Sequence, residues 1–176
     1  ENLSFVIELA KKFNVKKSNL IKAVKKFKGL NYRQQIIFKN KKISIINDSK
    51  STSYSSSIEM LKRKNNIYWL MGGIPKIGDK FNLSKNYCSN VQGYIFGVNQ
   101  KKFSLDLKKK IKIKKFFNLS KALNELFKDV KKDNSFKKTI LFSPAAASFD
   151  NFKNFEDRGK YFNKLIKKNI YARKIF

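Results

Sequence analysis

The 176 residues suffice for one domain with part of a second, and a content of 41% hydrophobic and 14% aromatic residues supports a packed core and argues against intrinsic disorder. Forty-one basic against 12 acidic side chains give a net charge of +29, and histidine is absent. This absence excludes His metal ligands, His general bases and Ser-His-Asp or Cys-His catalysis by this chain alone, while the single cysteine, Cys88, excludes an internal disulfide and a Cys-cluster zinc site.

Apolar spacing predicts two helices at the start of the chain. Residues 2–13 carry apolar side chains at helical intervals. A second helix is expected to be capped by Ser18 and closed by Gly29. The helical period ends near Gly29-Leu30, so we expect a boundary there between a helical pair and the rest of the chain.

The remaining sequence alternates between strand and helix patterns. The predicted strands are residues 35–38, 43–46, 67–72, 91–97, 111–116 and 138–142, with a polar turn around Asn40 between the first two. The predicted helices are residues 54–65, 99–108, 119–131 and 155–168. Such alternation implies parallel βαβ units, so the expected fold class is α/β, an open and mostly parallel sheet with helices on both faces.

The positive charge raises the alternative of a small basic nucleic-acid-binding module, because lysines that neutralise phosphates supply most of non-specific binding. The lysines are spread along the whole chain, however, and only four arginines are present. No RRM, KH or helix-turn-helix signature occurs. We therefore interpret the charge as a composition bias that solvates every exposed face, and expect no specific nucleic-acid partner.

No apolar run approaches the roughly 20 residues that span a bilayer, and no signal-peptide pattern occurs at the start. We therefore expect no membrane partner and a cytoplasmic location. The first residue is Glu1 rather than Met, which suggests that the sequence is part of a longer protein.

Three polar loops follow predicted strands, where open α/β sheets bind their ligands. The first begins with Asp48, which is either a helix cap or a ligand to a substrate, and continues to Thr52. The second, from Gly72 to Gly78, has the glycine spacing of a phosphate-binding P-loop but lacks its Lys-Ser/Thr, so that reading fails. The third, Ser143 to Asp150, is rich in small residues that leave room for a ligand or make a tight turn.

These segments together resemble the C-terminal portion of the Mur ligases, the ATP-dependent enzymes that add amino acids to the peptidoglycan precursor. Residues 47–52 (NDSKST) resemble the family's N-D-S-K-A-T, and Gly72-Gly73 with Lys76 resembles its glycine pair and lysine. Residues 94–97 (YIFG) resemble its next strand end. Residues 143–159 (SPAAASFDNFKNFEDRG) resemble S-P-A-x-A-S-x-D-x-F-K-N-F-x-x-R-G, which is the most specific match and favours the member that adds D-glutamate.

The resemblance implies a domain division. Residues 27–30 (FKGL) with Arg33 are similar to the family's hinge into its last domain, so 1–30 would be the final helices of the central ATP-binding domain. Residues 31–176 would be the Rossmann-like C-terminal domain. The P-loop, the Mg²⁺ ligands and the UDP site would lie in upstream domains of the same polypeptide, so this chain alone is expected to be inactive.

The resemblance also implies site residues, all of them binding rather than catalytic, and no metal ligand. D-Glutamate would be bound by Thr52, Lys76, Ser148 and the region of Phe155. ATP would be contacted by Arg33, Asp48, Lys50 and Asn2, and the acceptor would be UDP-N-acetylmuramoyl-L-alanine. ATP and Mg²⁺ would serve the full-length enzyme, with no cofactor bound by this chain alone.

Two departures from the family pattern occur, Tyr32 where histidine is usual and Ala146 where cysteine is common. Neither position is expected to make or break bonds. The alternatives within the family are the ligases that add L-alanine, a diamino acid or the D-Ala-D-Ala dipeptide.

Overall fold

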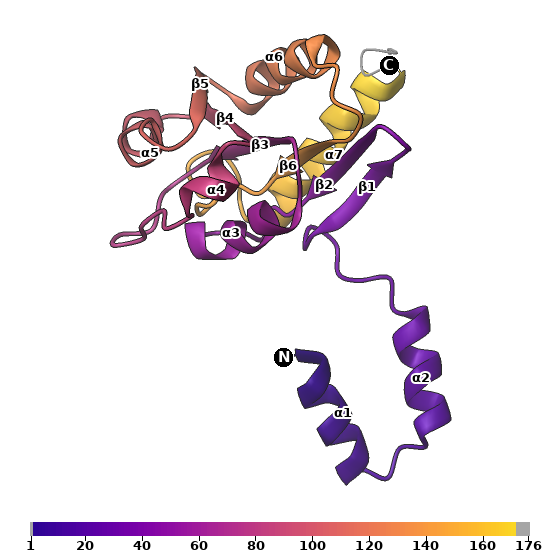
Figure 1. The fold of residues 1–176 in the computed structure, drawn as a ribbon. Helices are drawn as coiled ribbons and strands as arrows, with labels where there is room; N and C mark the ends of the chain where they lie inside the picture. The colour runs from indigo at the N-terminus through magenta and orange to yellow at the C-terminus, as the bar shows by residue number, and fades with distance from the viewer. Residues whose placement is uncertain (1, 172–176) are drawn as a thin grey trace. The chain divides into compact units, whose positions relative to one another are not determined.

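The chain forms two compact units in a computed structural model that describes residues 2–171, with side chains from Leu3 onward. The division falls between Leu30 and Asn31. We call the first the helical unit and the second the sheet unit (Figure 1).

The helical unit consists of α1 (Asn2–Lys12) and α2 (Lys17–Lys26), as the apolar spacing predicts. The cap prediction was wrong, because Lys16 is the N-cap of α2 and Ser18 lies inside the helix. An N-cap must have non-helical backbone, and the extended conformation already ends at Lys16. No residue of α2 is buried, and the apolar side chains of this unit are largely exposed.

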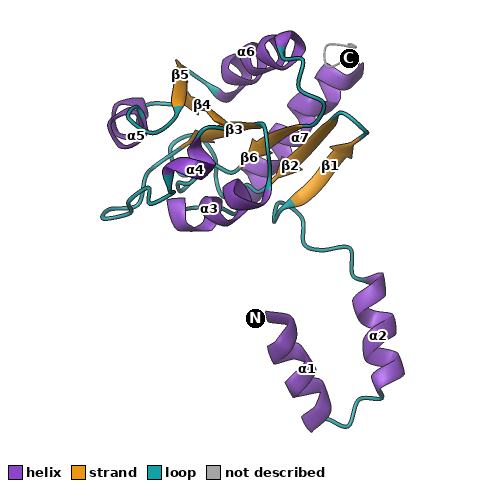
Figure 2. Ribbon diagram, in the orientation of Figure 1, coloured by secondary structure: helices purple, strands orange, loops and turns teal. Residues whose placement is uncertain are grey.

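The sheet unit is built on six strands in the order β1-β2-β6-β3-β4-β5 (Figure 2). The strands are β1 (Gln35–Lys39), β2 (Ile43–Asn47), β3 (Ile67–Gly72), β4 (Val91–Phe96), β5 (Lys112–Phe116) and β6 (Lys138–Phe142). β1 pairs with β2 in antiparallel register, and every other pairing is parallel. The predicted mostly parallel α/β sheet is confirmed.

The helices of this unit cover both faces of the sheet. They are α3 (Tyr54–Arg63), α4 (Lys85–Cys88), α5 (Gln100–Leu107), α6 (Leu119–Lys132) and α7 (Phe155–Tyr171). Side chains of α3, α4 and α5 enter one hydrophobic cluster, which contains Trp69. Those of α6 and α7 enter a second cluster, which contains Tyr94 and Phe142. Both faces of the central strands are therefore buried, which explains why β3 reads as an unbroken apolar run.

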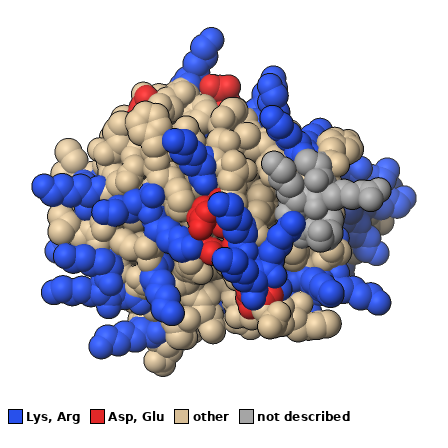
Figure 3. Space-filling model, turned by 90° about the horizontal axis from the view of Figure 1, so that it is seen from above, with Lys and Arg blue, Asp and Glu red and all other residues tan. Residues whose placement is uncertain are grey.

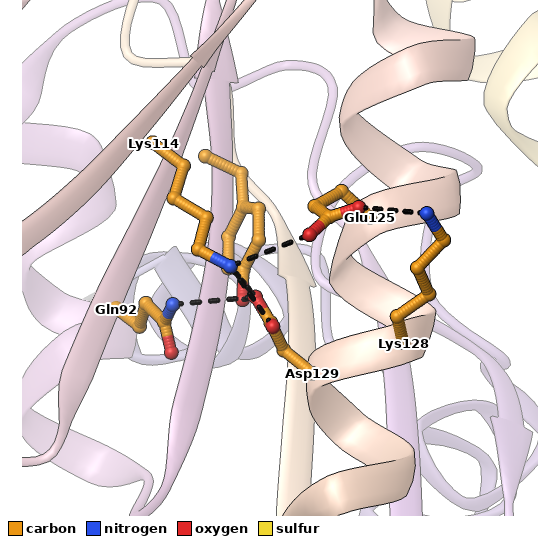
Figure 4. Close-up of polar contacts among 6 residues, drawn as sticks. Gln92, Lys114, Glu125, Lys128 and Asp129 are labelled. Carbon is orange, nitrogen blue, oxygen red and sulfur yellow. Dashed lines mark hydrogen bonds and ion pairs between the residues drawn. The ribbon is translucent and has the colours of Figure 1, made fainter.

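A polar cluster joins α6 to the two outer strands β4 and β5 (Figure 4). The ammonium nitrogen of Lys114 lies 2.7 Å from Asp129 Oδ2 and 3.5 Å from Glu125 Oε1. The same Asp129 oxygen accepts a 2.5 Å hydrogen bond from the Tyr94 hydroxyl. The hydrogen bond to Asp129 raises the pKa of Lys114. Because Asp129 is satisfied from both strands, the cluster fixes α6 on the sheet.

Candidate functional site

The predicted site lies where three neighbouring parallel strands end. β2, β6 and β3 are adjacent in the sheet and run in the same direction, so the loops that follow them leave the same edge. These loops begin at Asp48, Ser143 and Gly73, and α3 and α7 begin beyond the first and second of them. Ligands of open α/β sheets bind beyond this carboxyl edge.

Asp48 lies at the end of β2 with only 6% of its surface exposed. Its carboxylate accepts hydrogen bonds from the Gln34 backbone N–H, at 3.0 Å, and from the Ser143 hydroxyl, at 3.2 Å. Burial raises the pKa of Asp48 to about 6, although both hydrogen bonds and the charge of Arg33 oppose the shift. Asp48 is not a helix cap, since the N-cap of α3 is Ser53, which forms a capping box with Ser56.

A chain of buried hydroxyls connects the loop after β2 to the loop after β6. The hydroxyl of Ser57 lies 2.7 Å from that of Ser51 and 2.8 Å from that of Ser143. The indole N–H of Trp69 donates to the Ser143 carbonyl at 2.7 Å. Ser143, the first residue of the loop after β6, is therefore hydrogen-bonded to side chains of α3, β3 and Asp48.

Arg158, in the first turn of α7, is fully buried and binds two of the three loops. Its guanidinium donates to the Ser49 carbonyl at 2.8 Å, to the Ser49 hydroxyl at 3.1 Å and to the Gly72 carbonyl at 3.4 Å. Burial lowers the pKa of Arg158 to about 10, and the charge of Asp150 opposes this. The planar guanidinium suits such divergent carbonyl acceptors, so Arg158 fixes the strand ends relative to one another.

The glycine pair after β3 allows backbones to approach closely. Gly73 has a φ of +127°, and a Cβ added there would lie 2.2 Å from the Ala147 carbonyl oxygen. Next to it, Ile74 and Ala147 exchange two backbone hydrogen bonds of 2.9 Å. This bridge joins the loop that carries Lys76 to the loop that carries Ser148.

The four residues predicted to bind D-glutamate therefore belong to segments that are bonded to one another. Thr52 and Lys76 are exposed, whereas Ser148 is buried and Phe155 is half-buried. The carboxylate of Asp79, in the Lys76 loop, accepts a 2.6 Å hydrogen bond from the backbone N–H of Tyr54, two residues after Thr52.

The residues predicted to contact ATP divide between the two units. Asp48, Lys50 and Arg33 belong to the sheet unit, where Arg33 is exposed. The Lys50 ammonium lies 4.2 Å from the centre of the Phe155 ring, so a predicted ATP ligand touches a predicted wall of the D-glutamate site. Asn2 is the first residue of α1, and its side chain lies outside the described part of the structure.

The two departures from the family pattern have structural consequences. Tyr32 lies against α7, where a Cβ added at Gly159 would meet its ring at 2.4 Å. The Tyr32 carbonyl also accepts a 3.0 Å hydrogen bond from the Lys50 backbone N–H. Ala146 is fully buried in the hydrophobic cluster on the α3 side of the sheet.

Two polar residues that hold the site together were not identified from sequence as doing so. In the sequence, Arg158 was noted only as part of the motif of residues 143–159, and Ser143 only as the first residue of a loop of small residues. A basic residue one turn into a helix usually faces solvent, so nothing local indicated that Arg158 is buried. Its burial depends on acceptors distant in sequence, the Ser49 and Gly72 carbonyls.

Among the described residues, no group of three or more Asp, Glu, Cys or His side chains could hold a metal ion. None of the helices in the described part is long and apolar enough to cross a membrane. Two cavities of the sheet unit, of about 770 and 610 Å³, are lined by none of the predicted site residues. The larger one lies at the opposite, amino edge of β3 and β4, beside Ile67 and Val91.

This fold is that of the Mur ligases. The chain matches a UDP-N-acetylmuramate–alanine ligase, MurC, from Thermotoga maritima over 96% of its own length and 37% of that protein's, with a TM-score of 0.59 and 16% identity. It matches MurF from Acinetobacter baumannii over 94% and 37% of the respective lengths, with a TM-score of 0.64 and 15% identity. At these identities the structures show the fold alone.

The sequence relatives are more particular. UDP-N-acetylmuramoylalanine–D-glutamate ligases from Rickettsia felis and Rickettsia prowazekii are both 34% identical to the chain over 169 residues, which is 96% of its length. The ligase of the same name from a Wolbachia of Brugia malayi is 33% identical over 168 residues. The resemblance to the Mur ligases is thus confirmed. The chain spans 38% of the length of the two Rickettsia relatives, in their C-terminal part. No protein-family model matches it.

Proposed function

We propose that this chain is the C-terminal part of a cytoplasmic, ATP-dependent ligase that joins D-glutamate to UDP-N-acetylmuramoyl-L-alanine in peptidoglycan biosynthesis. The observation that carries the proposal is the 34% identity to D-glutamate ligases over 96% of the chain. The helical unit would be the end of a central ATP-binding domain, and the sheet unit the domain that delivers D-glutamate.

D-Glutamate carries two carboxylates, and the site offers donors for both. Lys76 supplies an ammonium, and Thr52 and Ser148 supply hydroxyls. The start of α7 adds backbone donors. Asn154 Oδ1 accepts from the Asp157 N–H at 2.8 Å, while the N–H groups of Phe155 and Glu156 have no protein acceptor among the described residues. The N-terminus of a long helix favours an anion, so these two groups suit one carboxylate.

ATP would be contacted by Arg33, Asp48 and Lys50 in the sheet unit and by Asn2 in the helical unit. Arg33 suits a phosphate, because its guanidinium can bind two oxygens at once. Each Asp48 oxygen keeps a lone pair beyond the bonds from Gln34 and Ser143, and an ionised carboxylate accepts from ribose hydroxyls. Lys50 would lie near the phosphates.

The upstream domains would use ATP, with Mg²⁺, to phosphorylate the acceptor carboxylate. The amine of bound D-glutamate then attacks the acyl carbon, the C–N bond forms, phosphate leaves with the C–O bond electrons and the nitrogen loses a proton. The role of this chain is to aim that amine. Orientation of this kind is worth roughly 7–11 kcal/mol in intramolecular reactions.

The test compares this chain with the complete polypeptide that its gene encodes. The complete protein should release phosphate from ATP only when UDP-N-acetylmuramoyl-L-alanine and D-glutamate are both present. L-Alanine, a diamino acid and D-Ala-D-Ala should not replace D-glutamate. The chain alone should release none. Phosphate release by the isolated chain, or a gene without a G-x-x-x-x-G-K-[ST] segment upstream, would contradict the proposal.

A further inference from the structure

A groove of about 610 Å³ lies at the outer margin of the sheet unit, formed by the residues after β4, the outer side of α5 and the end of β5. Three large apolar side chains line it. Val98 is 76% exposed, Leu105 60% and Phe117 76%. They come from three different segments, and an apolar set that converges on one hollow marks an interaction surface more clearly than scattered exposed residues do.

The groove is also positively charged. Lys101, Lys108 and Lys115 line it, and no aspartate or glutamate does. None of these three lysines forms an ion pair among the described residues. The carboxylate of Asp150 lies beside Gly97, one of the residues that line the groove.

We propose that this groove binds an acidic protein segment that carries apolar side chains. A second copy of this chain is a poor occupant, because two molecules of net charge +29 repel each other. An anionic membrane would share the chemistry, but a flat lipid surface would leave a hollow of about 610 Å³ unfilled. A hollow lined by both apolar side chains and lysines fits a segment that inserts side chains and places carboxylates on the lysines.

The proposal is independent of the ligase site. The predicted substrate residues follow β2, β3 and β6, whereas the groove lies at the ends of β4 and β5, and none of its lining residues has a role in the proposed function. A failure of one assignment therefore leaves the other intact.

The experiment measures binding of a fluorescein-labelled twelve-residue peptide to the whole chain by fluorescence anisotropy at physiological salt. The peptide contains six Glu, three Phe or Leu and three Ser, and its partner has Ser at every apolar position. The equal charge of the two peptides separates groove binding from the general attraction of a basic protein. The variants are Phe117→Ser in the groove and Phe136→Ser, a control that is 69% exposed elsewhere.

The apolar peptide should bind at least about tenfold more tightly than its Ser partner. Phe117→Ser should weaken that binding about tenfold, and Phe136→Ser less than about twofold. Equal binding of the two peptides, or equal effects of the two variants, would overturn the proposal. The proposal would also be overturned if vesicles containing phosphatidylserine bind in a Phe117-dependent manner while the peptide does not bind, because the occupant would then be lipid.

Discussion

Asp48 couples the stability of the sheet unit to pH. Its folded-state pKa of about 6 lies above the ordinary value of 3.8, because burial disfavours the carboxylate. The folded state therefore holds this proton more tightly than the unfolded state does. The resulting stabilisation is complete below about pH 4 and is lost as the pH rises through about 6, a difference of about 3 kcal/mol.

Asp48→Asn should remove this dependence, because the amide cannot ionise. Relative to the wild type, the free energy of unfolding of the variant should rise by about 3 kcal/mol between pH 4 and pH 7.5. Urea denaturation at a series of pH values measures the difference. Glu156→Gln, at an exposed carboxylate, controls for the loss of one charge. If the difference in the free energy of unfolding between Asp48→Asn and wild type stays constant with pH, the Asp48 carboxylate does not control stability between pH 4 and pH 7.5.

Lys76 tests the assignment of the substrate site. In the complete polypeptide, Lys76→Ala should raise the apparent KM for D-glutamate far more than that for ATP, because it removes one charge-assisted hydrogen bond to a carboxylate. Such a loss is worth on the order of 1.5–3 kcal/mol, or about tenfold to a hundredfold in affinity. Lys80→Ala, in the same exposed loop, is the matched control. Steady-state kinetics with each substrate varied in turn measure both KM values. Equal changes in the KM for D-glutamate in the Lys76→Ala and Lys80→Ala variants would refute the assignment.

At the scale of residues, the sequence predicted that polar loops follow the ends of three strands, but not which hydrogen bonds their side chains form. The strand-end position of Asp48 followed from the pattern of β2. Its burial did not, because it depends on Ser143, 95 positions later in the chain, and on the backbone of Gln34. The Ser18 cap failed for a related reason, since a hydroxyl near a helix start indicates a cap only to within a few residues.

At the scale of elements, α7 is positioned by a contact between an aromatic side chain of a loop, Tyr32, and a glycine of the helix, Gly159, which are distant in sequence. Tyr32 has a positive φ of 61° and packs its ring on Gly159 of α7. On the next turn, Asn163 Oδ1 accepts a 2.7 Å hydrogen bond from the amide of Asn47, which also donates to the Gly159 carbonyl at 2.9 Å. The helix therefore meets the end of β2 closely, and only glycine fits there.

Gly159→Ala should destabilise the sheet unit although alanine favours helices by about 1 kcal/mol. The added Cβ would lie 2.4 Å from the Tyr32 ring and 3.1 Å from its Cβ, so the conflict involves the base of the side chain as well as its end. We expect a net loss of about 1–2 kcal/mol in the free energy of unfolding. Lys160→Ala is the control at the neighbouring exposed position.

The double variant Gly159→Ala with Tyr32→Ala identifies the cause. Its loss in the free energy of unfolding should be smaller than the sum of the losses of the two single variants, because alanine at position 32 removes the clash. Urea denaturation measures the three losses. Strictly additive effects would show that the cost of Gly159→Ala arises elsewhere in α7.

Most elements were predictable because their periods are clear. β3, β5, β6 and α6 match the expected ranges within one residue. α4 was missed, since four residues cannot display a helical period. The network from Lys114 to Asp129 was also beyond sequence reasoning, because it joins side chains of two strands to a helix that follows them in the chain.

For the whole molecule, the order of strands was not predictable from the sequence although the class of sheet was. Alternating patterns imply parallel strands covered on both faces. The insertion of β6 between β2 and β3, which brings Ser143 next to Asp48, is a tertiary choice that no local pattern encodes. The predicted site depends on that insertion, since it places the loop of small residues between the two polar loops.

The charge of the molecule should produce binding to nucleic acid that has no sequence preference. Figure 3 shows basic side chains over the whole visible face, with a few acidic ones at its middle and toward its upper and lower margins, so no single patch dominates this face. Dispersed lysines act through counterion release alone, and the affinity for duplex DNA should fall by about a thousandfold or more between 50 and 200 mM salt.

Titrations of two unrelated duplexes at several salt concentrations should give the same line when the logarithm of the affinity is plotted against the logarithm of the salt concentration. Charge reversals in different units, Lys22→Glu in α2 and Lys160→Glu in α7, should weaken binding to similar extents. Binding that distinguishes the duplexes and survives physiological salt would instead establish a true nucleic-acid site.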